Sequence, residues 1–278
     1  MYRIPIGNYF DTLIDWLTNN LEPFFNGIKT VIVTIIDGFE MLLIAVPAYV
    51  LIAIITFIAW KVAGRKIAIF SAIGLLLIYN IELWEETMET LALVFTATVI
   101  ALLIGIPLGI WMARNNTVDR TIKPVLDFMQ TMPAFVYLIP AVIFFGLGKV
   151  PGAVATIIFA MPPVVRLTNL GIRQVPEDVV EAAKSFGSTD KQLLMKVQLP
   201  LATPTILAGV NQTIMLALSM VVISAMIGAR GLGEEVLKGV TQMQIGRGFE
   251  GGIAVVILAM VLDRVTQALG NSKKARTG

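Results

Sequence analysis

Three consecutive polar side chains interrupt a long apolar run near the end of the sequence. Asn211, Gln212 and Thr213 lie within residues 201–229, which contain no charged residue. Polar groups are costly inside a hydrocarbon layer, so these side chains must face protein or water. They would either line the pathway of a transported solute or form hydrogen bonds that hold helices together. We favour the hydrogen bonds and keep a polar pathway as the functional alternative.

Three further residues of the same run could line a gate. Met215, Ser219 and Met220 follow the polar triplet, and a flexible thioether can close around a small solute. Methionine in an apolar helix more often fills gaps in the packing. We therefore assign all six residues to a candidate translocation pathway, with ordinary packing as the alternative for the methionines.

The sequence offers little else for chemistry. It contains no Cys and no His, which excludes thiol nucleophiles, Cys/His metal sites and imidazole acid–base catalysis. The segment Gly146-Leu147-Gly148-Lys149 lacks the first glycine and the hydroxyl of a phosphate-binding loop. We expect no catalytic residue, metal or cofactor in this chain, and any ATP must be bound and hydrolysed by a partner.

The composition is that of a membrane protein. Of 278 residues, 56% are apolar and only 14% are charged, whereas soluble domains carry about 25% charged residues. Apolar runs of about 18 residues or more predict transmembrane helices. The net charge of +2 is too small to suggest a nucleic-acid partner. We therefore predict an all-α polytopic protein in a lipid bilayer.

The apolar runs divide the chain into four parts. Residues 1–40 have helical spacing with acids on one side and predict interfacial helices, although packing on the flank of the bundle is equally possible. Residues 41–88 hold two accessory spans, residues 89–270 the core, and residues 271–278 a basic tail. The seven predicted spans are 41–60, 67–81, 90–113, a span from Pro133 to 148, 151–165, one within 201–229, and 251–269.

The positive-inside rule orients these spans. Most of the 21 lysines and arginines fall in the cytoplasm when residues 166–204 are placed there. The N-terminus is then outside and the C-terminus cytoplasmic.

Residues 166–204 are too long and too patterned for an ordinary loop between spans. Pro162-Pro163 is expected to end the preceding span. Pro176 and the acids after it start a short helix, Gly187 stops it, and Ser188-Thr189-Asp190 caps a second helix that Pro200 ends. The segment predicts a helix-turn-helix on the inner membrane face.

At these residues the chain resembles the permeases of type I ABC importers, whose cytoplasmic loop carries E-A-A, three residues, G, nine residues, an aliphatic residue, one residue and L-P. The matching residues are Glu181, Ala182, Ala183, Gly187, Val197, Leu199 and Pro200. The resemblance implies a five-helix core over the last five spans, and it implies that these residues couple the chain to a cytoplasmic ABC ATPase. It also implies a homodimer, an extracellular substrate-binding protein and a bacterial plasma membrane.

Three further segments resemble a subgroup of these permeases and narrow the class of transported solute. The segments 130–140, 228–233 and 262–264 resemble permeases for glycine betaine, proline betaine and related quaternary ammonium osmoprotectants. Permeases for choline or methionine share parts of them and stay open as alternatives. An ion-coupled secondary transporter is less favoured, because the spans contain almost no acids or bases at mid-depth.

Overall fold

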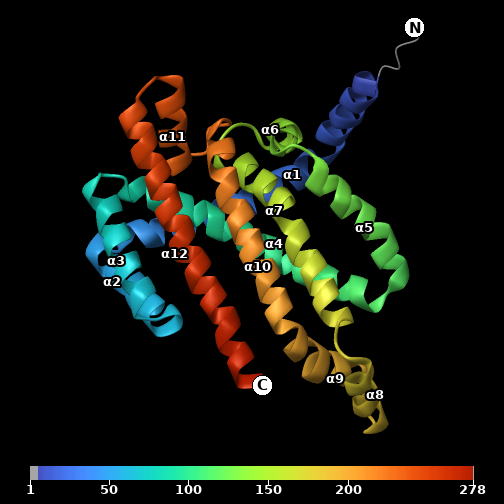
Figure 1. Ribbon diagram of the computed structural model, residues 1–278. Helices are drawn as coiled ribbons and strands as arrows, with labels where there is room; N and C mark the ends of the chain where they lie inside the picture. The colour runs from blue at the N-terminus through green and yellow to red at the C-terminus, as the bar shows by residue number, and fades with distance from the viewer. Residues whose placement is uncertain (1–5, 278) are drawn as a thin grey trace.

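The computed structural model describes the backbone of residues 6–277 and the side chains of residues 7–269, and all its regular elements are helices (Figure 1). The side chains of the predicted basic tail, 271–278, lie outside the described residues. Among the residues it covers, four helices are long and apolar enough to span a membrane, or up to six if each of two sharply bent helix pairs is one span. The polytopic helical class is therefore confirmed, but the count of seven spans is not.

Three helices form the centre of the molecule. They are α4 (Trp84–Arg114), α7 (Lys149–Arg173) and α10 (Leu199–Ala225), and α7 packs extensively against both of the others. Figure 1 shows α10 between α7 and α12 (Ile245–Thr277). Glycines make the close crossings possible, because small residues let helix backbones approach.

The N-terminal region differs in its boundaries from the sequence expectation. The element α1 (Ile6–Ala45) consists of two helices joined at a kink, with non-helical dihedral angles at Leu21, two residues before Pro23. The two accessory helices are α2 (Ala48–Ala63) and α3 (Arg65–Asn80), joined at Gly64. They pack on each other and on α12. Whether α1 lies in the membrane interface stays a prediction.

The predicted fourth span, from Pro133 to 148, begins where expected but consists of a short 3-10 helix η1 (Ala134–Tyr137) followed by the short helix α6 (Leu138–Phe145). The helix α5 (Asn116–Thr131) precedes it, and a break with a bend of 108° separates α5 from η1 and α6. The break lies at Pro133, since a proline disfavours the helical conformation of the residue before it. Met132 is accordingly extended, with ψ of 134°.

The expectation that Pro162-Pro163 ends the fifth span is wrong. The helix α7 continues through both prolines to Arg173. Both prolines are buried between neighbouring helices, and such packing allows membrane helices to tolerate the lost backbone hydrogen bonds. Residues 166–173 therefore belong to α7, and Arg166 and Arg173 lie on this helix rather than in a loop.

A charged contact closes the hairpin of α11 (Leu232–Thr241) and α12. The helices cross where Gly239 meets Gly248. The buried Glu235 carboxylate accepts hydrogen bonds from Arg247 Nε and from Lys238 Nζ, the latter at 2.9 Å. Burial raises the pKa of Glu235, but these two donors outweigh it and hold the pKa below its ordinary value.

We expect Glu235→Gln to loosen this hairpin at neutral pH, because two cations lose their carboxylate partner. Hydrogen bonds to charged groups contribute about 1.5–3 kcal/mol. Since the folded-state pKa is lowered, the stabilisation is present above the ordinary carboxyl pKa and is lost as pH falls toward the folded value. Hydrogen exchange of α11, corrected for intrinsic rates, should therefore differ between parent and variant at pH 7 and converge in acid. Glu250→Gln, an exposed acid on α12, should match the parent, and an equal effect of both variants would contradict this assignment.

Candidate functional site

The segment with the importer-like residues folds as two short helices. They are α8 (Glu177–Ser185) and α9 (Asp190–Leu193), and we call residues 177–193 the elbow. Glu177 and Asp178 lie in the first turn of α8, where acids complement the helix dipole. Thr189 and Gln192 form a capping box at the start of α9. The predicted helix-turn-helix is present.

The turn of the elbow depends on Gly187. Its φ is +78°, in the left-handed region. The Gly187 N–H donates to the Lys184 carbonyl at 2.9 Å, and the Ser188 N–H donates to the Ala183 carbonyl at 3.1 Å. These bonds satisfy the last carbonyls of α8 in the manner of a Schellman cap.

The elbow projects from the bundle. Figure 1 shows α8 and α9 at the end opposite α11. No residue of α8 is buried, and Phe186 is 91% exposed. Two contacts attach the elbow to the rest of the protein. Leu193 is buried, and Asp190 forms an ion pair of 3.9 Å with Arg114 at the end of α4. It therefore presents α8 and an aromatic side chain outward from a fixed base.

The expectation that Pro200 ends the second helix of this segment is wrong. After α9 the chain forms a π-helical turn, η2 (Leu194–Gln198), and runs directly into α10, with Pro200 in its first turn. Proline fits a first turn, and the wide turn before it accommodates its missing N–H. Val197 and Leu199 are partly buried at this junction. The elbow is thus continuous with α10 and joined to α7 by residues 174–176 only.

The six candidate pathway residues divide between two sides of α10. Gln212, Met215 and Ser219 are exposed, whereas Thr213 and Met220 are fully buried. The exposed residues recur at helical spacing and form what we call the α10 stripe. Its members on α10 are Leu201, Ala208, Gln212, Met215 and Ser219, and the exposed Met226 follows directly after the helix.

Asn211 takes part in a polar contact between α10 and α12. Its Nδ2 donates to Asp263 Oδ1 at 2.9 Å, and its Oδ1 accepts from the Thr266 hydroxyl at 2.6 Å. Gln267 Nε2 also donates to the same Asp263 oxygen at 2.7 Å. Asn211 therefore holds two helices together, as the favoured interpretation predicted, while the pathway interpretation fits only the residues of the α10 stripe.

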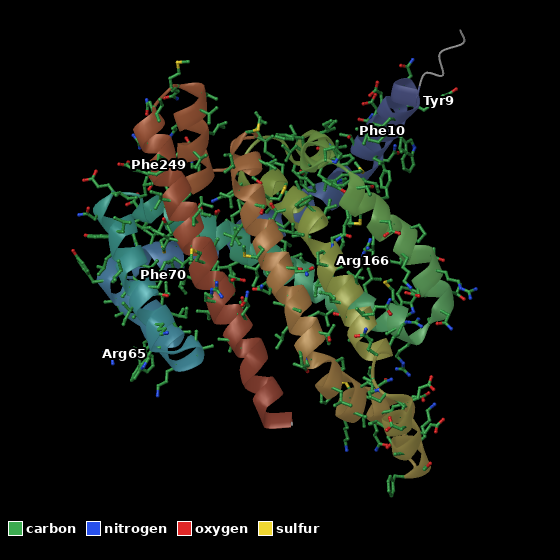
Figure 2. All side chains as sticks on the ribbon, viewed as in Figure 1. Tyr9, Phe10, Arg65, Phe70, Arg166 and Phe249 are labelled. Carbon is green, nitrogen blue, oxygen red and sulfur yellow. The ribbon has the colours of Figure 1, made fainter. Side chains whose placement is uncertain are left out.

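A cavity of about 490 Å³ lies between α5, α7 and α10. We call it the inner cavity. Asp127 of α5 and Arg166 of α7 face it and form an ion pair, with Gln212 of the α10 stripe also at its wall. Figure 2 shows Arg166 in the region between α7 and α5. The sequence did not indicate this site, because the expected helix end at Pro162-Pro163 placed Arg166 in a loop.

A second charge cluster borders the inner cavity. Buried Asp119 accepts hydrogen bonds from Lys123 Nζ at 2.7 Å and from Asn169 Nδ2 at 2.6 Å. Arg173 lies 3.7 Å from the same carboxylate and donates to the Met112 carbonyl at 2.8 Å. These charges are paired with one another and tie α5 to α7. Within the described residues, no group of three or more acidic side chains has a metal-binding arrangement.

Comparison with known proteins identifies the family. Residues 105–274 match the model of the binding-protein-dependent transport system inner membrane component. The chain is 52% identical over 274 residues to the glycine betaine transport system permease protein OpuAB of Bacillus subtilis (strain 168), which covers 99% of this chain and 97% of that protein. It is 56% identical over 278 residues to the glycine betaine/carnitine transport permease protein GbuB of Listeria monocytogenes serotype 1/2a (strain 10403S), with 99% and 98% covered.

Among solved structures, the MetNI methionine ABC transporter in an inward-facing conformation aligns with a TM-score of 0.63. The identity is 20%, and the match covers 69% of this chain and 95% of that chain. This likeness supports the predicted importer fold, and the family supports the predicted multi-pass location in the plasma membrane. With more than half of its residues matching the family model, the chain belongs to the inner membrane components of binding-protein-dependent transport systems.

Proposed function

We propose that this chain is the permease subunit of an ATP-driven importer for glycine betaine or a related quaternary ammonium osmoprotectant. In this proposal a cytoplasmic ABC ATPase binds and hydrolyses ATP, and an extracellular binding protein delivers the solute. The permease carries the solute by alternating access. The two relatives named above support the solute class, since their names specify glycine betaine and carnitine.

The observation that supports ATPase coupling best is the exposed elbow. Phe186 is the most exposed large apolar side chain among the described residues, at 91%, and aromatic residues often anchor interfaces. Because the elbow continues into α10 and is joined to α7 through residues 174–176, a displacement of α8 would be passed to α10 directly and to α7 through this short link. Glu181, Ala182 and Ala183 lie on this exposed helix, and Gly187 sets the turn after it.

The α10 stripe supports pairing with a second copy. It combines polar Gln212 and Ser219 with apolar Met215 along one face of a central helix. Two such faces opposed in a homodimer would enclose a pathway of mixed polarity.

The proposed orientation in the membrane follows from the distribution of positive charges. It places the elbow and the C-terminus in the cytoplasm and the N-terminus outside.

The test is uptake of labelled glycine betaine by proteoliposomes that contain the chain and an ABC ATPase that co-purifies with it, with the binding protein added. We expect uptake to require ATP and the binding protein. Phe186→Ala should lower co-purification of the ATPase and uptake about tenfold or more, since interface anchors contribute about 2 kcal/mol or more.

The matched control is Phe249→Ala. Phe249 is also an exposed aromatic residue, at 69%, but it lies at the α11 end (Figure 2). It should retain the ATPase. Uptake by the chain alone from an ion gradient without ATP would contradict the proposal, and preferential uptake of choline or methionine would redirect it to those solutes.

A further inference from the structure

The inner cavity contains charges of both signs, of which only one pair is not committed elsewhere in the bundle. Lys123 and Arg173 are held by Asp119, as described above. Arg166 and Asp127, by contrast, bond to each other through Arg166 Nη2 and Asp127 Oδ1. Their side chains are 38% and 63% exposed. Charged residues within membrane helices are expensive, and their presence at a cavity indicates a solute or ion pathway.

Arg166 also has unused hydrogen-bonding capacity. Its Nε–H is shielded from solvent and has no partner. A guanidinium presents its donors as a planar fork that matches a carboxylate bidentately. Asp127 bonds only to Nη2 of this guanidinium. Arg166 could therefore bind a carboxylate of another molecule through two N–H groups at once.

The walls of the inner cavity suit methyl groups. Pro163, Leu167 and Leu170 contribute apolar surface beside the ion pair, and Gln130 and Gln212 contribute neutral polar groups. A volume of about 490 Å³ is within the usual range for small-molecule sites, about 300–1,000 Å³. Because Gln212 belongs to the α10 stripe, the cavity adjoins the face that we assign to the pathway.

From these observations we infer that the Asp127–Arg166 pair is a subsite for a zwitterion that carries a carboxylate and a quaternary ammonium group. The solute carboxylate bonds to the Arg166 guanidinium, and the ammonium group lies against Asp127 with its methyl groups on the apolar wall. The ion pair opens to admit the solute. Arg166 then pairs with the solute carboxylate in place of Asp127, and Asp127 pairs with the solute ammonium group in place of Arg166. The inference rests on the proposed function and adds the residues that select the solute.

Charge balance makes this subsite selective. A zwitterion is neutral overall, as is the ion pair that it separates, so no charge is left unpaired in the bound state. A cation such as choline would displace Arg166 from Asp127 without offering a carboxylate in return. An anion such as acetate would bind Arg166 and leave Asp127 without a positively charged partner. In the open cavity the two side chains are 38% and 63% exposed, so the penalty arises when the cavity closes around the solute. Uncompensated charges away from water are then strongly unfavourable, and neither partial ligand should compete well.

The chain has no native cysteine, which permits a direct test by single-cysteine labelling. Leu170→Cys places a thiol at the inner cavity, where Leu170 is 44% exposed, and Val125→Cys places a control thiol on α5 away from it. The purified complex with its ATPase is treated with a maleimide in detergent, and the labelling rate is measured against glycine betaine concentration.

We expect glycine betaine to slow labelling of Leu170→Cys but not of Val125→Cys, while choline and acetate protect far less. Arg166→Gln should raise the half-protecting concentration of glycine betaine about tenfold or more, since a hydrogen bond to a charged group is lost. Asp127→Asn should do the same, and Arg166→Lys should retain part of the protection. ATP hydrolysis by each complex checks that the variants are folded.

Three results would overturn the inference. One is equal protection by choline and glycine betaine. Another is protection that persists undiminished in both Arg166→Gln and Asp127→Asn. The third is absence of protection in a complex that still imports glycine betaine, which would leave the proposed function standing. Failure of the unmodified complex to import glycine betaine would instead count against the proposed function.

Discussion

Replacing Gly109 with leucine is expected to prevent the permease from forming a stable bundle. A Cβ atom at Gly109 would lie 2.6 Å from Thr168 Cβ and 2.6 Å from the Val165 carbonyl oxygen, both on α7. Real Cβ atoms do not approach other heavy atoms so closely, and one of the two obstacles is backbone. The crossing of α4 and α7 would have to open, and these helices are central to the fold.

The smaller substitution Gly109→Ala should have the same effect to a lesser degree. Overpacking a tight interior costs about 1–3 kcal/mol, so Gly109→Ala should lower the thermal midpoint of the detergent-solubilised protein, and Gly109→Leu should give little monodisperse protein. Gly252→Ala on α12 is the control, because nothing lies within 4 Å of a Cβ built there. It should leave the midpoint unchanged or raise it slightly. A midpoint for Gly109→Ala equal to that of the parent would contradict this account.

Much of the helix pattern could be predicted from uncharged runs. The predicted span 90–113 corresponds to α4, which begins earlier, at Trp84. The helix extends backward through Glu85 and Glu86 because acids are favourable in a first turn. The elbow could also be predicted, since its start, turn and cap depend on local residues such as Pro176, Gly187 and Thr189.

The errors arose where tertiary packing overrides local signals. Pro162-Pro163 and Pro200 are helix breakers in isolation, yet α7 and α10 continue past them in a packed bundle. The sequence also could not assign a direction to each of Asn211, Gln212 and Thr213. Adjacent residues of a helix point about 100° apart, and the rotation of α10 is set by α7 and α12. The Asp127–Arg166 pair was missed because residues 39 positions apart meet only through this packing.

If the elbow couples the chain to an ATPase as proposed, its action should depend on the backbone conformation at Gly187 rather than on space around it. Nothing lies within 4 Å of a Cβ built on Gly187, but its φ of +78° is one that side-chain-bearing residues rarely adopt. The left-handed conformation costs an ordinary residue about 1–2 kcal/mol, asparagine tolerates it better, and β-branched residues tolerate it least. A series at this position therefore varies conformational strain without creating a clash.

We expect ATP-dependent uptake to fall in the order Gly187→Asn, Gly187→Ala, Gly187→Val, with the valine variant reduced about tenfold. A cost of about 1–2 kcal/mol changes a conformational population about 5–30-fold, and only elbows in the native turn would transmit the ATPase motion. Because the turn lies outside the packed bundle, the thermal midpoint should change little across the series. Gly246→Val is the control, since Gly246 has open space and no positive φ. Equal uptake by the asparagine and valine variants would show that the turn does not need this conformation and that α8 transmits force by another route.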